Sequence, residues 1–419
     1  MCVARLDGRV VLLRLALPGE RVLARVTQRR SKFWRAQVVQ VLDASPDRVP
    51  HPWPAGQAAG VGGMDMAHVA PAAARAAKAQ VVGEQLSHAL RQVVEVVVNP
   101  VGDAGPLGWR TRLDLVAGQD GRLGMYGPRS DRPVLVDAAP MAVPAIRELG
   151  LFERRFAPGR VVAVAPSDGP AFVVGQDQAA PRRNELVRLA DEREWRYSLD
   201  GRGFWQAHYM APATLVSAVL ERLGQVSGAV VWDLYCGAGL FTLPLAGAVG
   251  ADGLVVGVEA GHQAQRDALA NLDGLASARL VRADVAQFVA RAAAGLAGAL
   301  AGGAVGAGSL PGGAAGAGAL AGTTVSAGVP PRIAATARRP DVVVLDPPRA
   351  GLGPAVVQAL TSLAPPLILY VSCEVSTLAR DLAGLVAGGY QVTGVTGFDL
   401  FPGTWHVETI TVLVRPGAG

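Results

Sequence analysis

The sequence predicts an α/β protein made of three parts: a small β-barrel, a mostly antiparallel β region and a large open parallel sheet. Two observations carry this prediction. From about residue 205 onward, apolar strand-like runs alternate with helix-like segments, which is typical of a parallel sheet covered by helices on both faces. Before that point, short β-branched runs are separated by Gly and Pro, which favours antiparallel strands. The chain, at 419 residues, is also longer than one hydrophobic core usually serves.

Residues 1–50 have the pattern of a small, OB-like barrel. Their short apolar runs are broken at Asp7-Gly8 and Pro18-Gly19, dipeptides that favour tight turns. Arginines are scattered through the segment, and Phe33-Trp34 places two aromatic side chains together. Because basic groups bind phosphates and aromatic rings stack on bases, the segment could track a nucleic-acid strand. An ordinary barrel with a solvated charged face is the alternative.

Residues 51–92 are predicted to be a linker and a helix. The stretch 44–68 is rich in Pro, Gly and Ala and predicts little regular structure, whereas 69–92 has the pattern of an Ala-rich helix. In the region 93–203, β-branched runs from VVEVVV to AFVVG indicate a mostly antiparallel middle sheet. This region carries no recognisable catalytic pattern.

Residues 204–419 are predicted to form the parallel sheet. Its expected strands are VVWDLY, LVVGVE, ARLVRAD, DVVVLD, LILYVS and TITVLVR. Residues from about 291 to 335 do not fit this alternation, since they are nearly all Ala, Gly, Ser and Pro and are too small-sided to pack a core. We expect them to be a flexible surface insertion between a helix and a strand.

Composition narrows the class of protein. The 39 basic residues outnumber the 34 acidic ones, a net charge of +5 that suits a polyanionic partner, although a genome that favours arginine would explain part of it. Only three cysteines occur, Cys2, Cys236 and Cys373, which excludes a disulfide framework and an all-cysteine metal site. No signal-peptide pattern or bulky apolar span is visible. We expect a soluble cytoplasmic protein with no membrane partner.

The first candidate site features follow the first two strands of the parallel sheet. Tyr235-Cys236-Gly237 begins a glycine turn that leads into an apolar helix, where free backbone N–H groups can approach a ligand. Glu259 ends the next strand, at the same sheet edge, and could accept hydrogen bonds from both ribose hydroxyls of an adenosine. Asp284 ends the third strand and could face the adenine, or could simply cap a helix.

Three further candidates follow the later strands. Asp346 precedes two prolines that stiffen the chain, a turn suited to orienting a planar substrate. Cys373 ends LILYVS and would therefore be presented at the mouth of the site as a nucleophile, although a lone cysteine is more often buried as a small hydrophobe. Glu408 begins the last strand, where a carboxylate could act as a base or merely lie on the surface.

Together these segments resemble the RNA uracil-5 methyltransferase family. The resemblance rests on WDLYCGAGLFTLPLA, VVGVEA, VVLDPPRAGL, YVSCEVSTLARDL and DLFPGTWHVETI, in that order, and covers the C-terminal half. Upstream, residues 5–49 look like the RNA-binding TRAM domain of that family, and Gly203-Phe204-Trp205-Gln206 looks like its FxQ segment. The resemblance implies a Rossmann-like class I methyltransferase sheet, S-adenosyl-L-methionine as cofactor and RNA as partner.

The resemblance also implies a role for each site residue. Gln206, Tyr235, Glu259 and Asp346 would contact the methyl donor or the target base, Cys373 would be the nucleophile and Glu408 the base. Carbon 5 of uracil is too weak a nucleophile to take a methyl group directly, but thiolate addition at carbon 6 makes an enolate that can. The base must leave its stack to be reached, which favours a uridine in a single-stranded loop of rRNA or tRNA.

Three departures from the family pattern stand out. Glu374-Val375 follows the nucleophile where the family often has Asn-Pro, and this second acid is expected to raise the pKa of the thiol. Many relatives carry four cysteines for an iron–sulfur cluster, but the corresponding stretch, His51 through Met64, has none, so the cluster is predicted to be absent. The barrel also begins at what is usually its second half-strand, so we expect either that Met1 is an internal start or that the first strand is missing.

Other classes remain open at this point. A non-catalytic RNA-binding protein on the same fold would explain Glu374, but not the retention of Cys373 and Glu408. A cytosine-5 RNA methyltransferase would normally have a cysteine in the turn that here reads Asp346-Pro347-Pro348. A nicotinamide oxidoreductase would want a third glycine where Thr242 stands. The target RNA, the uridine, the oligomeric state and any protein partner are not readable from the sequence.

Overall fold

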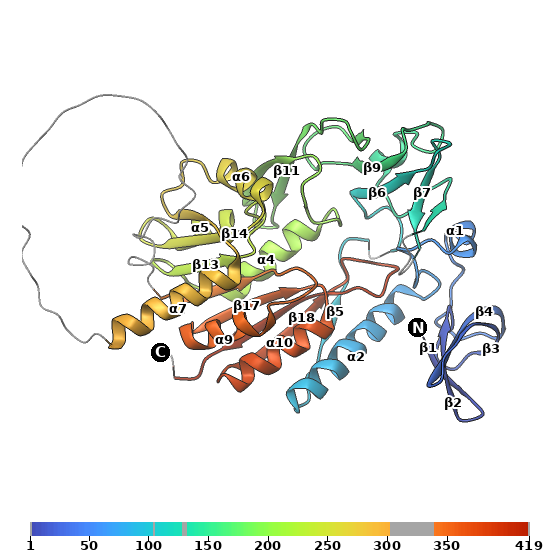
Figure 1. Ribbon diagram of the computed structural model, residues 1–419, viewed down its shortest axis with the longest axis horizontal. Helices are drawn as coiled ribbons and strands as arrows, with labels where there is room; N and C mark the ends of the chain where they lie inside the picture. Colours follow the sequence, from blue (N-terminus) through green and yellow to red (C-terminus); the bar gives the residue numbers. More distant parts are fainter. Residues whose placement is uncertain (1, 104, 128–131, 302–338, 418–419) are drawn as a thin grey trace, which may run out of the picture.

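The computed structural model describes residues 2–103, 105–127, 132–301 and 339–417, which form a mixed α/β protein (Figure 1). Four sheets occur in this part of the chain, and the largest has eight strands. The prediction of an α/β fold with a large sheet is thus confirmed. Within the described residues, no helix is long and apolar enough to cross a bilayer.

The large sheet has the strand order β15-β14-β13-β16-β17-β19-β18-β5. Its first five strands are parallel, whereas β19 runs antiparallel to both of its neighbours, so the sheet is not parallel throughout. The strands, in chain order, are β5 (Val97–Asn99), β13 (Val230–Leu234), β14 (Leu254–Glu259), β15 (Ala278–Arg282), β16 (Val342–Leu345), β17 (Leu367–Ser372), β18 (Gln391–Phe398) and β19 (Glu408–Val414).

The edge strand β5 corrects one prediction. The run VVEVVV was expected in the middle sheet, but Val97–Asn99 pairs in parallel with β18 at the edge of the large sheet. A strand of three residues, two of them valines, can extend either sheet, and here the helix before it decides. That helix, α2 (Pro71–Leu90), packs Val82 and Leu86 into the core of the large sheet and so delivers the chain to its edge.

Helices cover both faces of the large sheet. One face carries α4 (Ala211–Leu223), α5 (Thr242–Val249) and α6 (His262–Asn271), and the other carries α2 with α7 (Val285–Ala301), α9 (Gly353–Leu363) and α10 (Val375–Ala387). Alternate residues of one strand enter the two cores: Val231 faces the first, while Val230 and Trp232 face the second. Figure 1 shows α2 beside α10, although the two are far apart in sequence.

The middle region forms an antiparallel sheet of order β10-β9-β6-β7-β8 and a separate hairpin, β11-β12. Its elements are β6 (Arg112–Ala117), β7 (Leu123–Tyr126), β8 (Pro133–Leu135), α3 (Pro144–Arg147), β9 (Gly159–Val164), β10 (Phe172–Val174), β11 (Arg182–Arg188) and β12 (Glu194–Asp200). The hairpin packs on the large sheet and its helices, since Tyr197 and Leu199 are buried in the same core as α4.

The segment predicted as a linker with little regular structure is packed. It contains the short helix α1 (Pro54–Ala59), and Trp53 and Met64 are buried in the core of the middle sheet. His51 holds the segment together, because its Nδ1 accepts from the backbone N–H of Trp53 at 3.0 Å and its Nε2 lies 3.0 Å from the carbonyl of Met64. Trp53 and Met64 stand among many Ala and Gly residues, so the sequence pattern did not predict that this segment packs.

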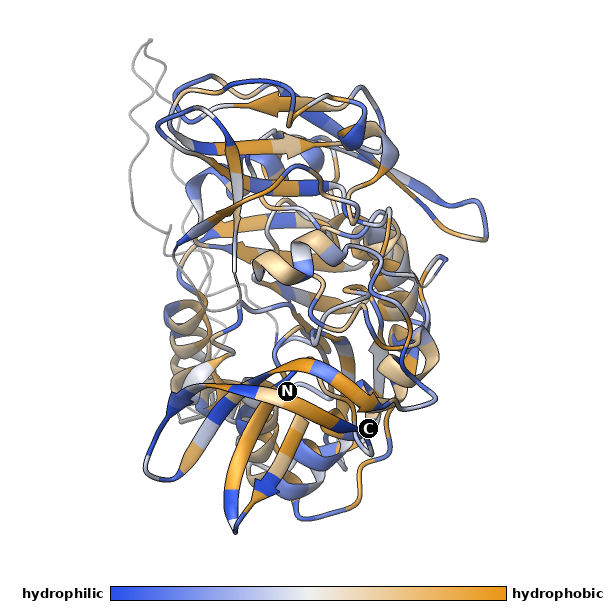
Figure 2. Cartoon of the chain, turned by 90° about the vertical axis from the view of Figure 1, so that its right-hand side faces the viewer, coloured by the Kyte–Doolittle hydropathy of each residue, from blue (hydrophilic) through white to orange (hydrophobic). Residues whose placement is uncertain are grey.

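The N-terminal strands form a four-stranded sheet of order β1-β2-β4-β3. They are β1 (Cys2–Leu6), β2 (Arg9–Arg14), β3 (Arg21–Arg29) and β4 (Phe33–Asp43), and Figure 2 shows apolar stretches along strands near the N label. Asp7 and Gly8 both have positive φ, as a tight hairpin turn requires. Closure of these strands into an RNA-binding barrel stays a prediction.

Part of the predicted Ala/Gly insertion is helical. The helix α7 continues to Ala301, so residues 291–301 belong to it, because alanine is the strongest helix former. Residues 302–335 of the predicted insertion lie outside the described residues. The described part of the chain continues at residue 339, just before β16.

Candidate active site

The carboxyl ends of the central parallel strands bring three predicted residues to one level. Leu234 at the end of β13 pairs with Val258 in β14 and with Leu345 in β16. One residue further along each strand come Tyr235, Glu259 and Asp346. Since parallel strands end at the same sheet edge, the register itself places these side chains in one row.

The glycine turn after β13 is built around Glu259. Tyr235, Gly237 and Gly239 all have positive φ, a conformation that glycine adopts readily and tyrosine rarely. One carboxylate oxygen of Glu259 accepts from the N–H of Gly237 at 3.1 Å, and the other accepts from the N–H of Gly261 at 2.5 Å. Each oxygen keeps a lone pair for a further donor. A Cβ added to Gly237 would meet nothing within 4 Å, so the turn faces open space.

Thr242 replaces the third glycine of a dinucleotide-binding turn, and the structure shows what it does there. Its hydroxyl donates to the carboxylate of Asp233 at 2.5 Å, and both side chains are buried. Burial raises the pKa of Asp233 to about 7. This pair ties the end of β13 to the start of α5. The sequence analysis missed this role of Asp233, and an acid inside an otherwise apolar strand was the available signal.

Asp284 is placed as a helix cap. Its Oδ1 accepts from the N–H of Gln287 at 3.0 Å, in the first turn of α7. Its charge also reaches Tyr235, because burial and then Asp284 raise the pKa of that phenol to about 12. A contact with adenine stays a prediction.

Cys373 and Glu408 face each other across two antiparallel strands. Ser372, the last residue of β17, pairs with Thr409 in β19, so the next pair outward is Cys373 and Glu408. The hydroxyl of Thr409 donates to the carbonyl of Ser372 at 3.0 Å and locks this register. Cys373 is half-buried, whereas Glu408 is only 4% exposed. A thiol and a carboxyl group from two different strands therefore meet at the same sheet edge.

The electrostatics of this pair are dominated by burial. Burial, followed by the charge of Glu408, raises the pKa of the Cys373 thiol to about 11, while Arg349 opposes the rise. Burial and the neighbouring Asp346 hold the pKa of Glu408 well above its usual range. Burial also raises the pKa of Asp346 to about 7. The two buried carboxyl groups beside the thiol therefore hold their protons at a higher pH than exposed carboxyl groups do.

Glu374 behaves differently from the expectation that it would raise the pKa of the thiol. Its carboxylate faces α10, where it accepts from the hydroxyl of Ser376 at 2.8 Å and caps the helix. The rise in the pKa of Cys373 comes instead from burial, Glu408 and Asp346. A Glu at this position can turn away from the thiol because the helix start offers it free N–H donors.

A hydrogen-bond network fixes the turn that follows Asp346. The hydroxyl of Thr377 donates to the carbonyl of Arg349 at 3.0 Å, and Arg380 donates to the carbonyl of Ala350 at 2.8 Å. Asp381 accepts from the N–H of Leu352 at 2.7 Å and from the hydroxyl of Tyr370 at 2.9 Å. Asp381, an acid on the apolar face of α10, was not among the site residues predicted from the sequence.

The loop before Glu408 is held by a residue that the sequence analysis did not single out. Lys78 of α2 donates to Asp399 at 2.6 Å and to the carbonyl of Phe401 at 3.1 Å, and both charged side chains are almost fully buried. Asp399 in turn donates its backbone N–H to the carbonyl of Asn99 at 2.9 Å. The only signal was a lysine among the alanines of a helix.

Gln206 lies apart from the strand ends. It lies just before α4, and its exposed fraction is 9%. It lines a cavity to which none of the other predicted site residues contributes. The residue after it, Ala207, accepts from both the N–H and the hydroxyl of Thr111, so this segment is attached to the middle sheet. The structure thus places Gln206 between the middle sheet and the large sheet.

Metal binding finds no support in the described residues, which hold no cluster of three or more His, Cys, Asp or Glu side chains suited to a metal. The absence of an iron–sulfur cluster stays a prediction from the cysteine count.

Comparisons with known proteins agree with this arrangement. A family model described as tRNA (Uracil-5-)-methyltransferase matches residues 333–416. An "Uncharacterized RNA methyltransferase" of Streptomyces avermitilis is 34% identical, over 100% of this chain and 96% of its own. The 23S rRNA (uracil(1939)-C(5))-methyltransferase RlmD of Alkalilimnicola ehrlichii is 30% identical, over 99% of this chain and 93% of its own.

One solved structure shares the fold over almost the whole chain. It is the tRNA (uracil-54, C5)-methyltransferase of Pyrococcus abyssi in complex with S-adenosyl-L-homocysteine, with a TM-score of 0.62. The two sequences are 22% identical, and the match covers 98% of this chain and 96% of that one.

Proposed function

We propose that the chain, which belongs to the RNA uracil-5 methyltransferase family, methylates carbon 5 of a uridine through a covalent adduct on Cys373. The enzyme uses S-adenosyl-L-methionine and acts on RNA. The observation that carries the covalent mechanism is the strand register, which sets Cys373 opposite Glu408 beside Asp346.

The row of strand ends fits the methyl donor. Glu259 would accept from the ribose hydroxyls through its remaining lone pairs, and the open space above Gly237 leaves room for the nucleoside. Tyr235, and Asp284 whose charge acts on it, would flank the adenine. When bound, S-adenosyl-L-methionine supplies an electrophilic methyl group. Gln206, which lies apart from this row just before α4, would contact the donor or the target base.

The first chemical step belongs to Cys373. Its thiol loses a proton to solvent, and the thiolate forms a bond to carbon 6 of uracil. The electron pair of the 5,6 double bond is then shared between carbon 5 and the carbonyl oxygen on carbon 4 as an enolate. Arg349 favours this step because its positive charge lowers the pKa of the thiol. Carbon 5 then carries the electron pair that accepts the methyl group.

The last step belongs to Glu408. Its carboxylate removes the proton from carbon 5, the double bond re-forms, and the thiolate leaves carbon 6. The net change is the loss of one proton from uracil and the gain of one methyl group. Because Cys373 and Glu408 act in deprotonated forms and both have raised pKa values, turnover is expected to rise with pH through the neutral range.

The target is inferred to be an unpaired uridine of rRNA or tRNA. Glu408 and Cys373 lie at a sheet edge that a base can reach only after it leaves its stack. The family description names tRNA, whereas the relative that is 30% identical acts on 23S rRNA, so both RNA classes belong in the test. A cytosolic location would keep Cys373 reduced.

The test is transfer of labelled methyl from S-adenosyl-L-methionine to unmodified rRNA and tRNA, followed by nucleoside analysis. Wild-type protein is expected to place label in 5-methyluridine in one of the two RNA classes, and Cys373→Ala to place none. Label in 5-methylcytidine would overturn the uracil assignment. RNA binding without any label would favour a non-catalytic RNA-binding protein on the same fold.

A further inference from the structure

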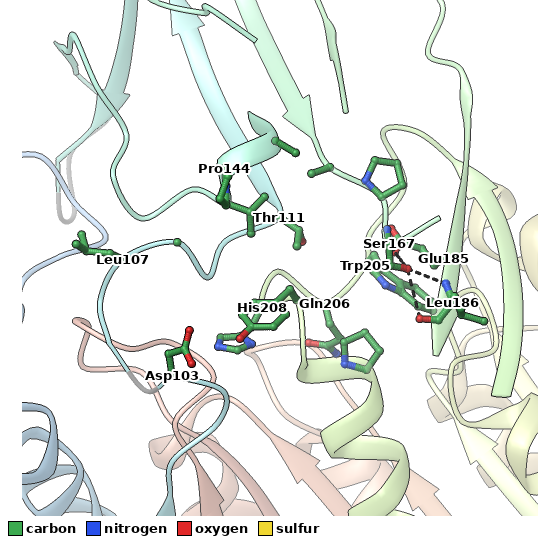
Figure 3. Close-up of a pocket in the computed structure, with 17 residues that line it drawn as sticks. Asp103, Leu107, Thr111, Pro144, Ser167, Glu185, Leu186, Trp205, Gln206 and His208 are labelled. Carbon is green, nitrogen blue, oxygen red and sulfur yellow. Dashed lines mark hydrogen bonds between the residues drawn. The ribbon is translucent and has the colours of Figure 1, made fainter. Parts of the chain in front are cut away.

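A cavity of about 590 Å³ lies between the middle sheet and the start of α4 (Figure 3). Of the residues assigned to the reaction, only Gln206 lines this cavity. The cavity is therefore separate from the row of strand ends. Its volume is in the range of sites that hold small ligands or single nucleotides. In Figure 3, Gln206 and His208 lie between the strands of the middle sheet and α4.

One wall of the cavity is an aromatic stack. The rings of His208 and Tyr209 are stacked at 5.0 Å, and those of His208 and Trp109 at 5.8 Å, both within 17° of parallel. Trp109 is buried, whereas Tyr209 is 45% exposed and lines the cavity. The stack therefore ends in a tyrosine ring with one covered face, and its other face is available for a further flat ring.

Backbone contacts hold this platform in place. The N–H of Tyr209 donates to the carbonyl of Trp109 at 3.1 Å, and the N–H of Met210 donates to Nδ1 of His208 at 3.1 Å. Burial lowers the pKa of His208 to about 4, so its ring is neutral and carries its hydrogen on Nε2. At Gly102, even a Cβ would come within 2.6 Å of the tyrosine hydroxyl, so this ring is closely seated.

The polar lining indicates which part of a nucleotide enters. Asp103 and Glu185 give the cavity two carboxyl groups, which disfavour a phosphate. Within the described residues, the Asp103 carboxylate and the Gln206 amide have no hydrogen-bond partner. Carboxylate and amide groups pair with the edges of bases. A base can therefore stack on Tyr209 and still satisfy its polar edge.

The same aromatic groups reach the catalytic loop. Phe401, in the loop before Glu408, packs edge-on against Trp109 at 6.3 Å and against His406 at 5.9 Å. The ring column thus runs from the cavity to the loop that positions the base Glu408. A ring stacked on Tyr209 would therefore lie at one end of a column whose other end, His406, is two residues before Glu408.

The geometry points to a second base-binding subsite in this cavity, where a nucleotide flanking the target uridine stacks on Tyr209. This inference rests on the proposed function, since it takes RNA as the substrate and Cys373 as the place of the target base. The subsite would fix the register of the RNA strand and so contribute to the choice of uridine.

The test measures the Kd of a short RNA that contains the target uridine. One abasic residue is placed in turn at each position next to that uridine. Tyr209→Ala is expected to raise the Kd for intact RNA by roughly 5- to 100-fold, the usual range for losing one stacked base. Tyr209→Phe keeps the ring and should bind like wild type. Tyr126→Ala is the matched control, because Tyr126 is 47% exposed but does not line the cavity.

The decisive result is coupling between protein and RNA changes. One abasic position should weaken binding to wild type but have no further effect on Tyr209→Ala. An unchanged Kd for Tyr209→Ala, or effects that multiply at every position, would overturn the subsite. A loss of S-adenosyl-L-methionine affinity in Tyr209→Ala would also overturn it, by assigning the cavity to the cofactor. Failure of the wild type to form 5-methyluridine would instead refute the proposed function.

Discussion

At the scale of the residue, the reactivity of Cys373 depends on the balance of charges around it. Glu408 and Asp346 oppose ionisation of the thiol, and Arg349 favours it. A nucleophile with a raised pKa is slow until its surroundings change, so the resting thiol is protected from adventitious oxidation. The arginine that follows the two prolines is thus the residue that tunes the cysteine, a role that its place in the sequence did not reveal.

Replacing Arg349 should make the thiol less reactive. Arg349→Met removes the charge that lowers the pKa of Cys373, so alkylation of Cys373 by iodoacetamide should require a higher pH than in wild type. Mass spectrometry of the Cys373 peptide over a pH series measures this shift. Glu374→Gln is the control, because that carboxylate caps α10, and its profile should stay near that of wild type. An equal shift in both variants would contradict the assignment.

At the scale of the element, helix α2 supports the loop before Glu408 through one buried ion pair. Lys78 and Asp399 are 1% and 3% exposed in their side chains, so neither charge is solvated by water. A buried pair of this kind contributes modestly to stability while intact, but leaves an uncompensated charge when one partner is removed.

Removing the lysine should therefore destabilise the protein. Lys78→Met is expected to lower the free energy of unfolding by about 3–5 kcal/mol. Urea denaturation followed by circular dichroism measures it. Lys32→Met is the matched control, since Lys32 is the only other lysine in the chain and is exposed. Adding Asp399→Asn to Lys78→Met should restore part of the loss, because the buried unpaired charge is gone; no recovery would argue against the ion-pair explanation.

At the scale of the whole molecule, the sequence predicts the site where local rules suffice. Strand ends of a parallel sheet share one edge, so Tyr235, Glu259 and Asp346 could be placed together from their positions alone. The meeting of Cys373 with Glu408 needed the antiparallel register of β19, which a sheet predicted as parallel did not contain.

Long-range packing set the rest. Lys78 reaches Asp399 across most of the chain, β5 joins the large sheet instead of the middle one, and the cavity beside Gln206 forms only where two sheets meet. None of these follows from periodicity or turn chemistry, because each depends on which apolar faces find each other. The loop before Glu408 is consequently supported by residues far from it in the sequence, Lys78 and Asn99.

The measurement that tests the central claim most directly is trapping with RNA that carries 5-fluorouridine at the target position. Fluorine at carbon 5 cannot be removed as a proton, so Glu408 cannot complete the reaction and the adduct should persist. Wild type should give a covalent protein–RNA complex whose linkage maps to Cys373, and Cys373→Ala should give none. With ordinary RNA, Glu408→Gln should accumulate the corresponding methylated adduct, which carries hydrogen in place of fluorine at carbon 5. A linkage at another residue, or methyl transfer that persists in Cys373→Ala, would contradict the covalent mechanism.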